Sequence, residues 1–132
     1  MPKSYRAGAD LTAARGKPVS RNGLIASSGG EGVTIAINAT ATAESIGILT
    51  VNALATAGGV GTTAGEMLAV AVDGDECEAL CGVTWTAGQA LSPHADGLQP
   101  ALATHQIVAR AGADNLTIGS RSRVIVTNAG IF

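Results

Sequence analysis

Two cysteines and two histidines are the side chains in this sequence best suited to ligate a transition metal. In chain order they are Cys77, Cys81, His94 and His105. Ten residues separate the two histidines, whereas a zinc finger separates its pair by about three to five. On a strand, Cys77 and Cys81 would lie about 13 Å apart, too far for one zinc ion or a disulfide; on a helix they would lie one turn apart. We expect two small buried thiols beside Val83 and Trp85, with no metal and no cofactor.

Four carboxylates gather around an Asp-Gly turn. They are Asp73, Asp75, Glu76 and Glu78. An oxygen-rich turn can bind calcium, but the sequence holds only a fragment of the EF-hand order and lacks its bidentate glutamate. We expect a solvated hairpin end, and the same carboxylates are candidates to receive a basic segment from a partner.

The sequence contains no catalytic constellation. The glycine-rich segment 58–65 lacks the lysine of a P-loop and does not fit G-x-G-x-x-G. It is expected to be a loop, or a close contact with a neighbouring subunit. The serines occur in no G-x-S-x-G motif, and neither histidine has a nucleophile placed near it by the sequence. We therefore predict that the protein is not an enzyme.

The composition predicts a small folded domain with a thin aliphatic core. Of 132 residues, 25 are alanine and 18 are glycine, and the aromatic residues are one Trp, one Tyr and one Phe. The apolar segments are too short to cross a membrane, and no secretory signal is expected. Alanine and glycine contribute little burial, so packing against identical copies would add stability that the monomer lacks.

Basic residues are confined to the two ends of the sequence. The net charge is +4 over 1–21, −8 over 22–109, where there is no Lys or Arg, and +2 over 110–132. An acidic body with basic ends can attract a second copy of the same chain, whereas that body repels nucleic acid. We expect neither a nucleic-acid nor a membrane partner. The basic segment either contacts a partner or folds back on its own domain, and the charge pattern leaves both open.

Short alternating segments separated by turn residues indicate an all-β fold. Residues 1–22 are polar and irregular, which predicts an extended basic N-terminal arm. The expected strands cover 33–38, 45–51, 67–72, 77–85, 106–111 and 122–128, with a further hairpin turn at Asp96-Gly97 between Leu91 and Leu98. This spacing predicts a small β-barrel or β-sandwich of about seven short strands, in a single domain over 23–132.

Two later segments resemble a known family. They are VTWTAGQALSPHADGLQPALATHQIVARA over 83–111 and SRSRVIVTN over 120–128. In order they contain a strand, a T-A-G-Q turn, an A-D-G hairpin, an I-V-A-R-A strand and a closing R-V-I-V strand. This order is similar to that of the decoration, or cement, proteins of tailed-bacteriophage capsids.

The resemblance implies a homotrimer on the outer capsid surface of the virion, bound over junctions of the major capsid protein and stabilising the head lattice. The candidate shell-binding residues of the arm are Lys3, Tyr5, Arg6, Arg15, Lys17 and Arg21. Three arms on one trimer would bind together with high effective concentration. We expect removal of residues 1–21 to leave the fold intact and to abolish shell binding.

A small carbohydrate- or ligand-binding β-module is the alternative function. Such a module needs an exposed aromatic platform, and Trp85 is the credible candidate. Its phase with Cys81 and Val83 on an alternating strand places it in the core instead. The decoration protein is therefore the preferred hypothesis, ahead of the ligand module and the enzyme.

Overall fold

The computed structural model describes residues 3–7, 15–24, 33–50 and 67–132, which form strands, turns and irregular segments and contain no helix. The strands described are β1 (Lys3–Ala7), β2 (Pro18–Leu24), β3 (Val33–Ile37), β4 (Gly47–Leu49), β5 (Met67–Ala71), β6 (Glu76–Leu80), β7 (Ala90–His94), β8 (Gly97–Pro100), β9 (Gln106–Ala111) and β10 (Arg121–Ile131). The prediction of an all-β fold is confirmed. Within these residues, nothing helical has the length and apolarity to cross a membrane.

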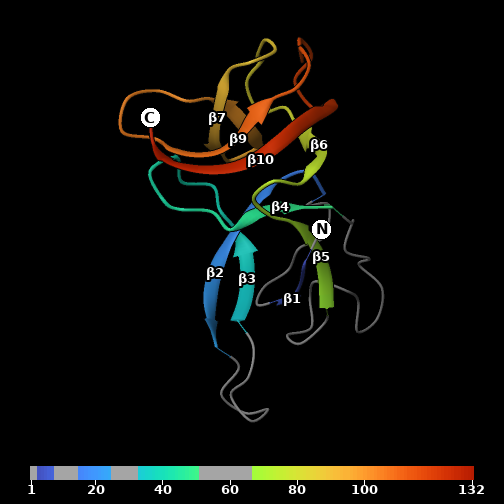
Figure 1. Cartoon of the computed structure of the whole chain (residues 1–132), viewed down its shortest axis with the longest axis vertical. Coiled ribbons are helices and arrows are strands. Elements are labelled where there is room, and N and C mark those ends of the chain that lie inside the picture. The colour runs from blue at the N-terminus through green and yellow to red at the C-terminus, as the bar shows by residue number, and fades with distance from the viewer. Residues whose placement is uncertain (1–2, 8–14, 25–32, 51–66) are drawn as a thin grey trace.

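The first five strands close into a small barrel, which forms the lower half of the molecule in Figure 1. Their order is β1-β3-β2-β4-β5, and β5 pairs back with β1. β1 runs parallel to β3, and the other neighbouring strands are antiparallel. Because the ring closes, each barrel strand has a hydrogen-bonded neighbour on both sides.

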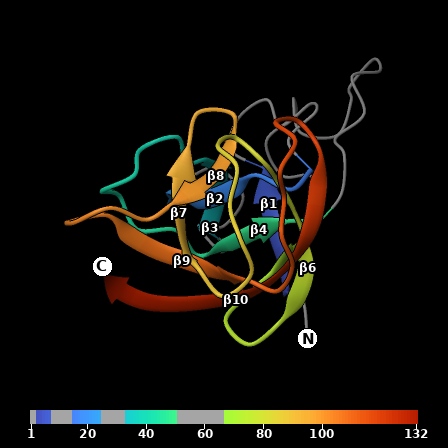
Figure 2. The same cartoon turned by 90° about the horizontal axis from the view of Figure 1, so that it is seen from above.

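The other five strands form an antiparallel sheet in the order β6-β10-β9-β7-β8. β10 is its longest strand, and Figure 2 shows it sweeping alongside β9. An isolated bridge between Cys81 and Leu98 joins the region after β6 to β8, so the two edges of the sheet approach each other. This sheet contains the segments that carry the family resemblance.

The barrel and the sheet share one hydrophobic core. Ile48 and Ala71 of the barrel pack in the same cluster as Leu91, Val124 and Val126 of the sheet. Several other residues of this cluster are small, including Ala79, Ala109 and Ala111. The core is therefore continuous but thin, as the composition predicts.

Gly16 marks a close approach between the two halves. Its amide donates to Leu49 O in β4, and its carbonyl accepts from Leu80 N–H in β6. Its φ is +87°, and a Cβ at this position would lie 2.8 Å from Leu80 N. Only glycine satisfies both the backbone conformation and the spacing.

The extended arm expected over residues 1–22 is corrected by the structure. Lys3–Ala7 is a barrel strand paired with β3 and β5, and Pro18 begins β2, so the boundary expected at residue 22 falls inside a strand. The arm was expected because most side chains of this segment are polar. Backbone hydrogen bonds hold a strand in its sheet whatever its side chains are. Only alternate side chains point into the core, so a mostly polar segment can still form a strand, and Val19 of β2 is fully buried.

The strand expected over 77–85 is shorter than predicted. β6 ends at Leu80, and the chain bends at Gly82 and Val83, which leaves Val83 exposed while Trp85 is buried. A strict alternation from Cys77 to Trp85 is therefore wrong. The glycine-rich segment 58–65 lies outside the described residues.

Candidate functional site

The basic residues predicted to form the arm lie at the barrel. Lys3, Tyr5 and Arg6 are in β1, Arg21 is in β2, and Arg15 and Lys17 lie in the segment that enters β2. The Lys3 side chain is exposed, and those of Arg15 and Lys17 are half-buried. The orientations of Tyr5, Arg6 and Arg21 lie outside what the structure describes.

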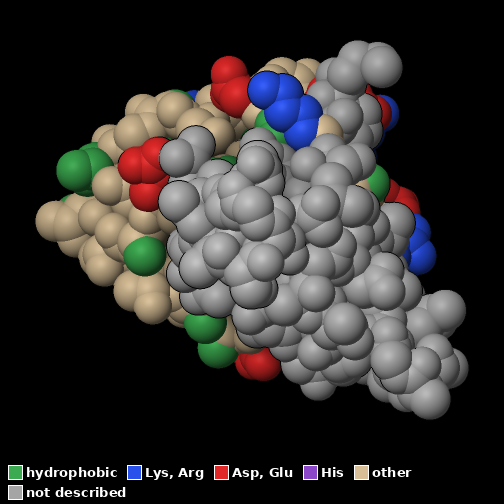
Figure 3. All heavy atoms as spheres, turned by 90° about the horizontal axis from the view of Figure 1, so that it is seen from below, with side chains coloured by type: hydrophobic (Ala, Val, Ile, Leu, Met, Phe, Trp, Pro, Cys, Tyr) green, Lys and Arg blue, Asp and Glu red, His purple; other side chains and the backbone are tan. Residues whose placement is uncertain are grey.

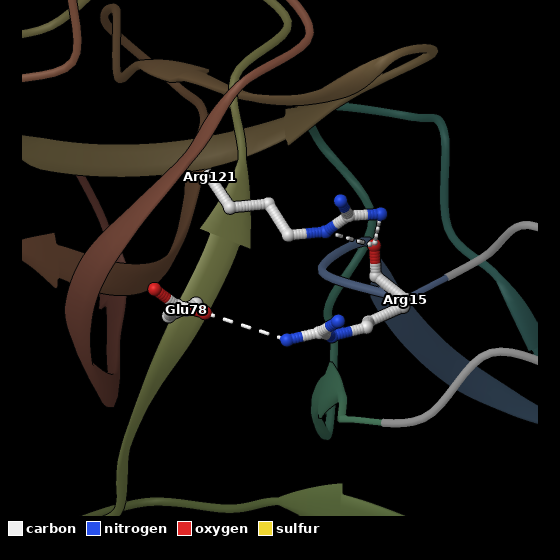
Figure 4. A network of polar contacts seen from close by, with 3 residues as sticks. All are labelled: Arg15, Glu78 and Arg121. Atoms are coloured by element: carbon white, nitrogen blue, oxygen red, sulfur yellow. Dashed lines mark hydrogen bonds and ion pairs between the residues drawn. The ribbon is translucent and has the colours of Figure 1, made fainter.

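Arg15 contacts an acidic residue of its own chain. Its Nη2 lies 3.4 Å from Oε1 of Glu78 on β6, and its carbonyl oxygen accepts hydrogen bonds from the Arg121 guanidinium on β10 (Figure 4). The side chains of Arg15 and Glu78 are 42% and 59% exposed, so solvent screens the pair and it contributes little stability. The contact shows that, at Arg15, the basic segment folds back on its own domain.

The four clustered carboxylates each contact a different group of the protein. Asp75 Oδ2 accepts the Val72 N–H at 2.9 Å, and Asp73 Oδ1 accepts the Asn128 N–H at 3.1 Å, so both fix the turn that leads into β6. Asp75 is buried. Glu76 lies 3.8 Å from Arg123 across the sheet, and both are exposed. The cluster is thus not a single open acidic surface.

Acidic, basic and apolar side chains are interspersed on the described part of one face of the molecule. Viewed from below, Lys and Arg side chains lie beside Asp and Glu, with small apolar spots between them (Figure 3). On that face, the described surface does not form a uniformly basic area of the kind that binds nucleic acid.

The two cysteines lie where their thiols are unreactive. Burial, followed by the negative charges of Asp75, Glu78 and Glu76, raises the pKa of the Cys77 thiol to about 12. Burial also raises the pKa of Cys81. Both thiols are therefore protonated at neutral pH and are poor nucleophiles and poor metal ligands.

Among the described residues, no three His, Cys, Asp or Glu side chains lie close enough together to hold a metal ion. Cys77 and Cys81 are free thiols in and just after β6. His94, at the end of β7, accepts the Asp96 N–H through Nδ1 at 3.1 Å, which fixes the β7–β8 turn.

Ser92 and His105 form a pair that the sequence did not reveal. Ser92 Oγ lies 2.9 Å from His105 Nδ1, the geometry of a nucleophile and its base. However, Ser92 is fully buried, and the same Nδ1 accepts the Leu102 N–H at 3.1 Å. Because Nδ1 accepts from the backbone, the serine hydroxyl must donate to it as well. The pair therefore fixes the turn before β9 and presents no nucleophile to a substrate.

Trp85 is held inside the fold. Its side chain is 1% exposed, and its indole N–H donates to Ala113 O at 3.0 Å. It cannot serve as the exposed aromatic platform that the ligand-binding alternative requires.

An open hollow of about 560 Å³ lies on the barrel side of the molecule. Its described lining is Ser20, Ala43, Glu44 and Ile46. Glu44 is the one ionisable side chain of that described lining, so these residues provide no convergent set of polar groups for a small ligand.

Two groups of exposed aliphatic and aromatic side chains are the features that sequence analysis missed. The hairpin tip consists of Val83, Leu116 and Ile118. The open end consists of Leu102, Ile131 and Phe132. Each residue falls in or beside a turn or strand end, where a sequence pattern does not distinguish a buried side chain from an exposed one. The alternation of Leu116 and Ile118 with polar residues was the available signal.

The chain matches no protein-family model, and no curated protein or solved structure matches it either.

Proposed function

We propose that this protein is a structural component of a tailed-bacteriophage head that binds the outer surface of the capsid shell as a trimer and stabilises its lattice. The observation that carries the proposal is the placement of the resembling segments. The T-A-G-Q turn leads directly into β7, the A-D-G hairpin joins β7 to β8, and the two strands that follow are β9 and β10 of the same sheet. Residues that resemble the family in order therefore also form one structural unit.

The polar side chains described above support a structural role. Asp75, His94 and His105 each hold a turn, and Ser92 is buried against His105. A binding protein without catalysis needs a rigid scaffold that displays a surface, and these residues provide such rigidity.

The basic residues of the N-terminal segment are the candidate contacts with acidic patches of the shell. Because the segment belongs to the barrel, the contact would come from side chains displayed on a folded surface. Lys3 is the most exposed of these described side chains, and Lys17 is half-buried at the entrance to β2.

Co-sedimentation with expanded shells, assembled from the major capsid protein of the phage that encodes this chain, tests the proposal. We expect saturable binding and a higher temperature of shell disruption. The double variant Lys3→Glu, Lys17→Glu should bind at least tenfold more weakly, whereas the matched Lys3→Arg, Lys17→Arg variant should bind normally. Folded protein that never sediments with the shells would overturn the proposal.

A further inference from the structure

One face of the sheet carries all three arginines that follow residue 22 in the sequence. Arg121, Arg123 and Ile125 occupy alternate positions of β10, so their side chains leave the same side of the sheet. Arg110 of β9 lies directly opposite Ile125 and shares that side. All four side chains are exposed. We call these four residues the arginine face.

Two glutamates border the arginine face, and each has an arginine partner. Glu76 and Glu78 lie on β6, the neighbour of β10 in the sheet. Glu76 Oε1 is 3.8 Å from Arg123 Nε. Glu78 Oε1 is 3.4 Å from Arg15 Nη2. Both carboxylates are therefore already paired with basic side chains of the same chain.

Arg110 and Arg121 have no carboxylate partner in the described part of the chain. Arg110 Nη1 donates to Gly88 O at 2.8 Å. Arg121 donates from Nε and Nη2 to Arg15 O, at 3.4 and 3.3 Å. A guanidinium has five N–H donors, so each of the two arginines retains donors for an anion. Their positions in the sheet are about 14 Å apart, from four residues along β10 and one strand spacing.

The side chains of the arginine face fit a protein partner better than a nucleic acid. Duplex DNA carries a negative charge about every 1.7 Å along its axis, and the carboxylates of Glu76 and Glu78 would repel some of these charges. A protein surface can place single carboxylates opposite Arg110 and Arg121, which arginine binds through two parallel hydrogen bonds. Such a surface can also cover Ile125, which is 45% exposed in the middle of the face.

The arginine face adjoins the basic segment that the proposed function assigns to the shell. Arg121 donates to the backbone of Arg15 (Figure 4), and Lys17 lies two residues further along that segment. A partner docked on the arginine face would therefore meet this segment at the edge of the face. The continuity of the two basic regions favours the same acidic partner for both.

We propose that the arginine face docks on an acidic surface of the capsid shell, where Arg110 and Arg121 each donate to a carboxylate of the major capsid protein. This inference rests on the proposed function and deepens it. It names a docking surface on the sheet in addition to the basic residues at the barrel. Because the arginines are held by paired strands, the spacing of the two carboxylates that they accept is fixed.

Charge reversal tests the proposal by co-sedimentation with expanded shells, assembled from the major capsid protein of the phage that encodes this chain. The Arg110→Glu, Arg121→Glu double variant should bind about tenfold more weakly than the wild type, or worse. The matched Arg110→Lys, Arg121→Lys variant keeps both positive charges and should bind much more tightly than the reversed variant. Circular dichroism and the fluorescence of buried Trp85 verify that every variant is folded.

A second pair of substitutions should strengthen binding. The Glu76→Gln, Glu78→Gln variant removes two negative charges from the border of the face and releases Arg123 and Arg15 from their ion pairs. We expect this variant to bind shells more tightly than the wild type. A variant that was only destabilised would not gain affinity, so this result separates electrostatic docking from a structural effect.

The outcomes separate the proposal from the proposed function. If wild type and the reversed variant bind shells equally, the docking surface is wrong and the proposed function stands. If folded wild type never binds shells, the proposed function is refuted and the docking surface with it. Light scattering and gel retardation of duplex DNA test the other partners. Self-association or DNA binding that is lost in the folded reversed variant, while shell binding is kept, would overturn the proposal.

Discussion

Single polar residues hold turns in the structure, and one of them, His105, was a candidate metal ligand in the sequence. His105 has an Nδ1 that accepts from both Leu102 N–H and Ser92 Oγ, and Asn115 pairs with three groups of its loop. A buried polar group that loses such a partner costs about 1–3 kcal/mol. These side chains therefore stabilise the turns in which they lie.

Because of the Cys77 thiol, we expect the free energy of unfolding to change with pH in the alkaline range. Its pKa is raised to about 12 in the folded protein, above the ordinary thiol value of about 8.5 in the unfolded chain. The unfolded chain thus releases this proton first, so the free energy of unfolding falls as the pH rises from about 8.5 towards 12. Urea unfolding of wild type and Cys77→Ala at several pH values checks this, because the variant should show a shallower fall. Equal slopes would contradict the assignment.

At the scale of elements, the sequence predicted the strands whose apolar residues alternate and missed those whose side chains are polar. Val33–Ile37, Met67–Ala71 and Gln106–Ala111 lie where the pattern placed them. β1 was missed because its pairing with β5 is a long-range backbone interaction that no local pattern contains. For the same reason, no local signal indicated that Ser92 would meet His105. The exposure of Leu116 and Ile118 did have a local signal, their alternation with polar residues.

Gly47 decides whether β4 can close the barrel against β5. A Cβ at this position would collide with the Ala71 carbonyl oxygen, which is backbone and cannot move aside. We expect Gly47→Ala to lower the free energy of unfolding by about 3 kcal/mol. Gly74→Ala is the matched control: its φ of +93° is unfavourable for alanine, but its Cβ would meet nothing within 4 Å, so a loss of about 1 kcal/mol is expected. Urea titrations that give both variants the same loss would show that crowding at β4 is unimportant.

At the scale of the whole molecule, the two halves depend on one another. The segment around Gly16 bonds to both β4 and β6, Gly74 N–H donates to Val126 O, and Gln106 N–H donates to Ala41 O. With a core shared between the barrel and the sheet, neither half has its own complete interior. Surfaces on the sheet, including the hairpin tip, therefore depend on an intact barrel.

Removal of β1 tests this dependence and the correction of the N-terminal arm together. Without residues 1–7, β3 and β5 each lose a neighbour and the closed barrel gains two open edges. We expect the truncated protein to unfold at a markedly lower urea concentration than the wild type and to aggregate when concentrated, while Lys3→Ser, which changes an exposed side chain in the same strand, unfolds normally. A truncated protein with the wild-type midpoint would restore the interpretation of residues 1–22 as an arm separate from the fold. If the truncated protein is less stable, as expected, shell contacts of this segment must be studied by surface substitutions. Deletion would remove the contacts and destabilise the barrel at the same time.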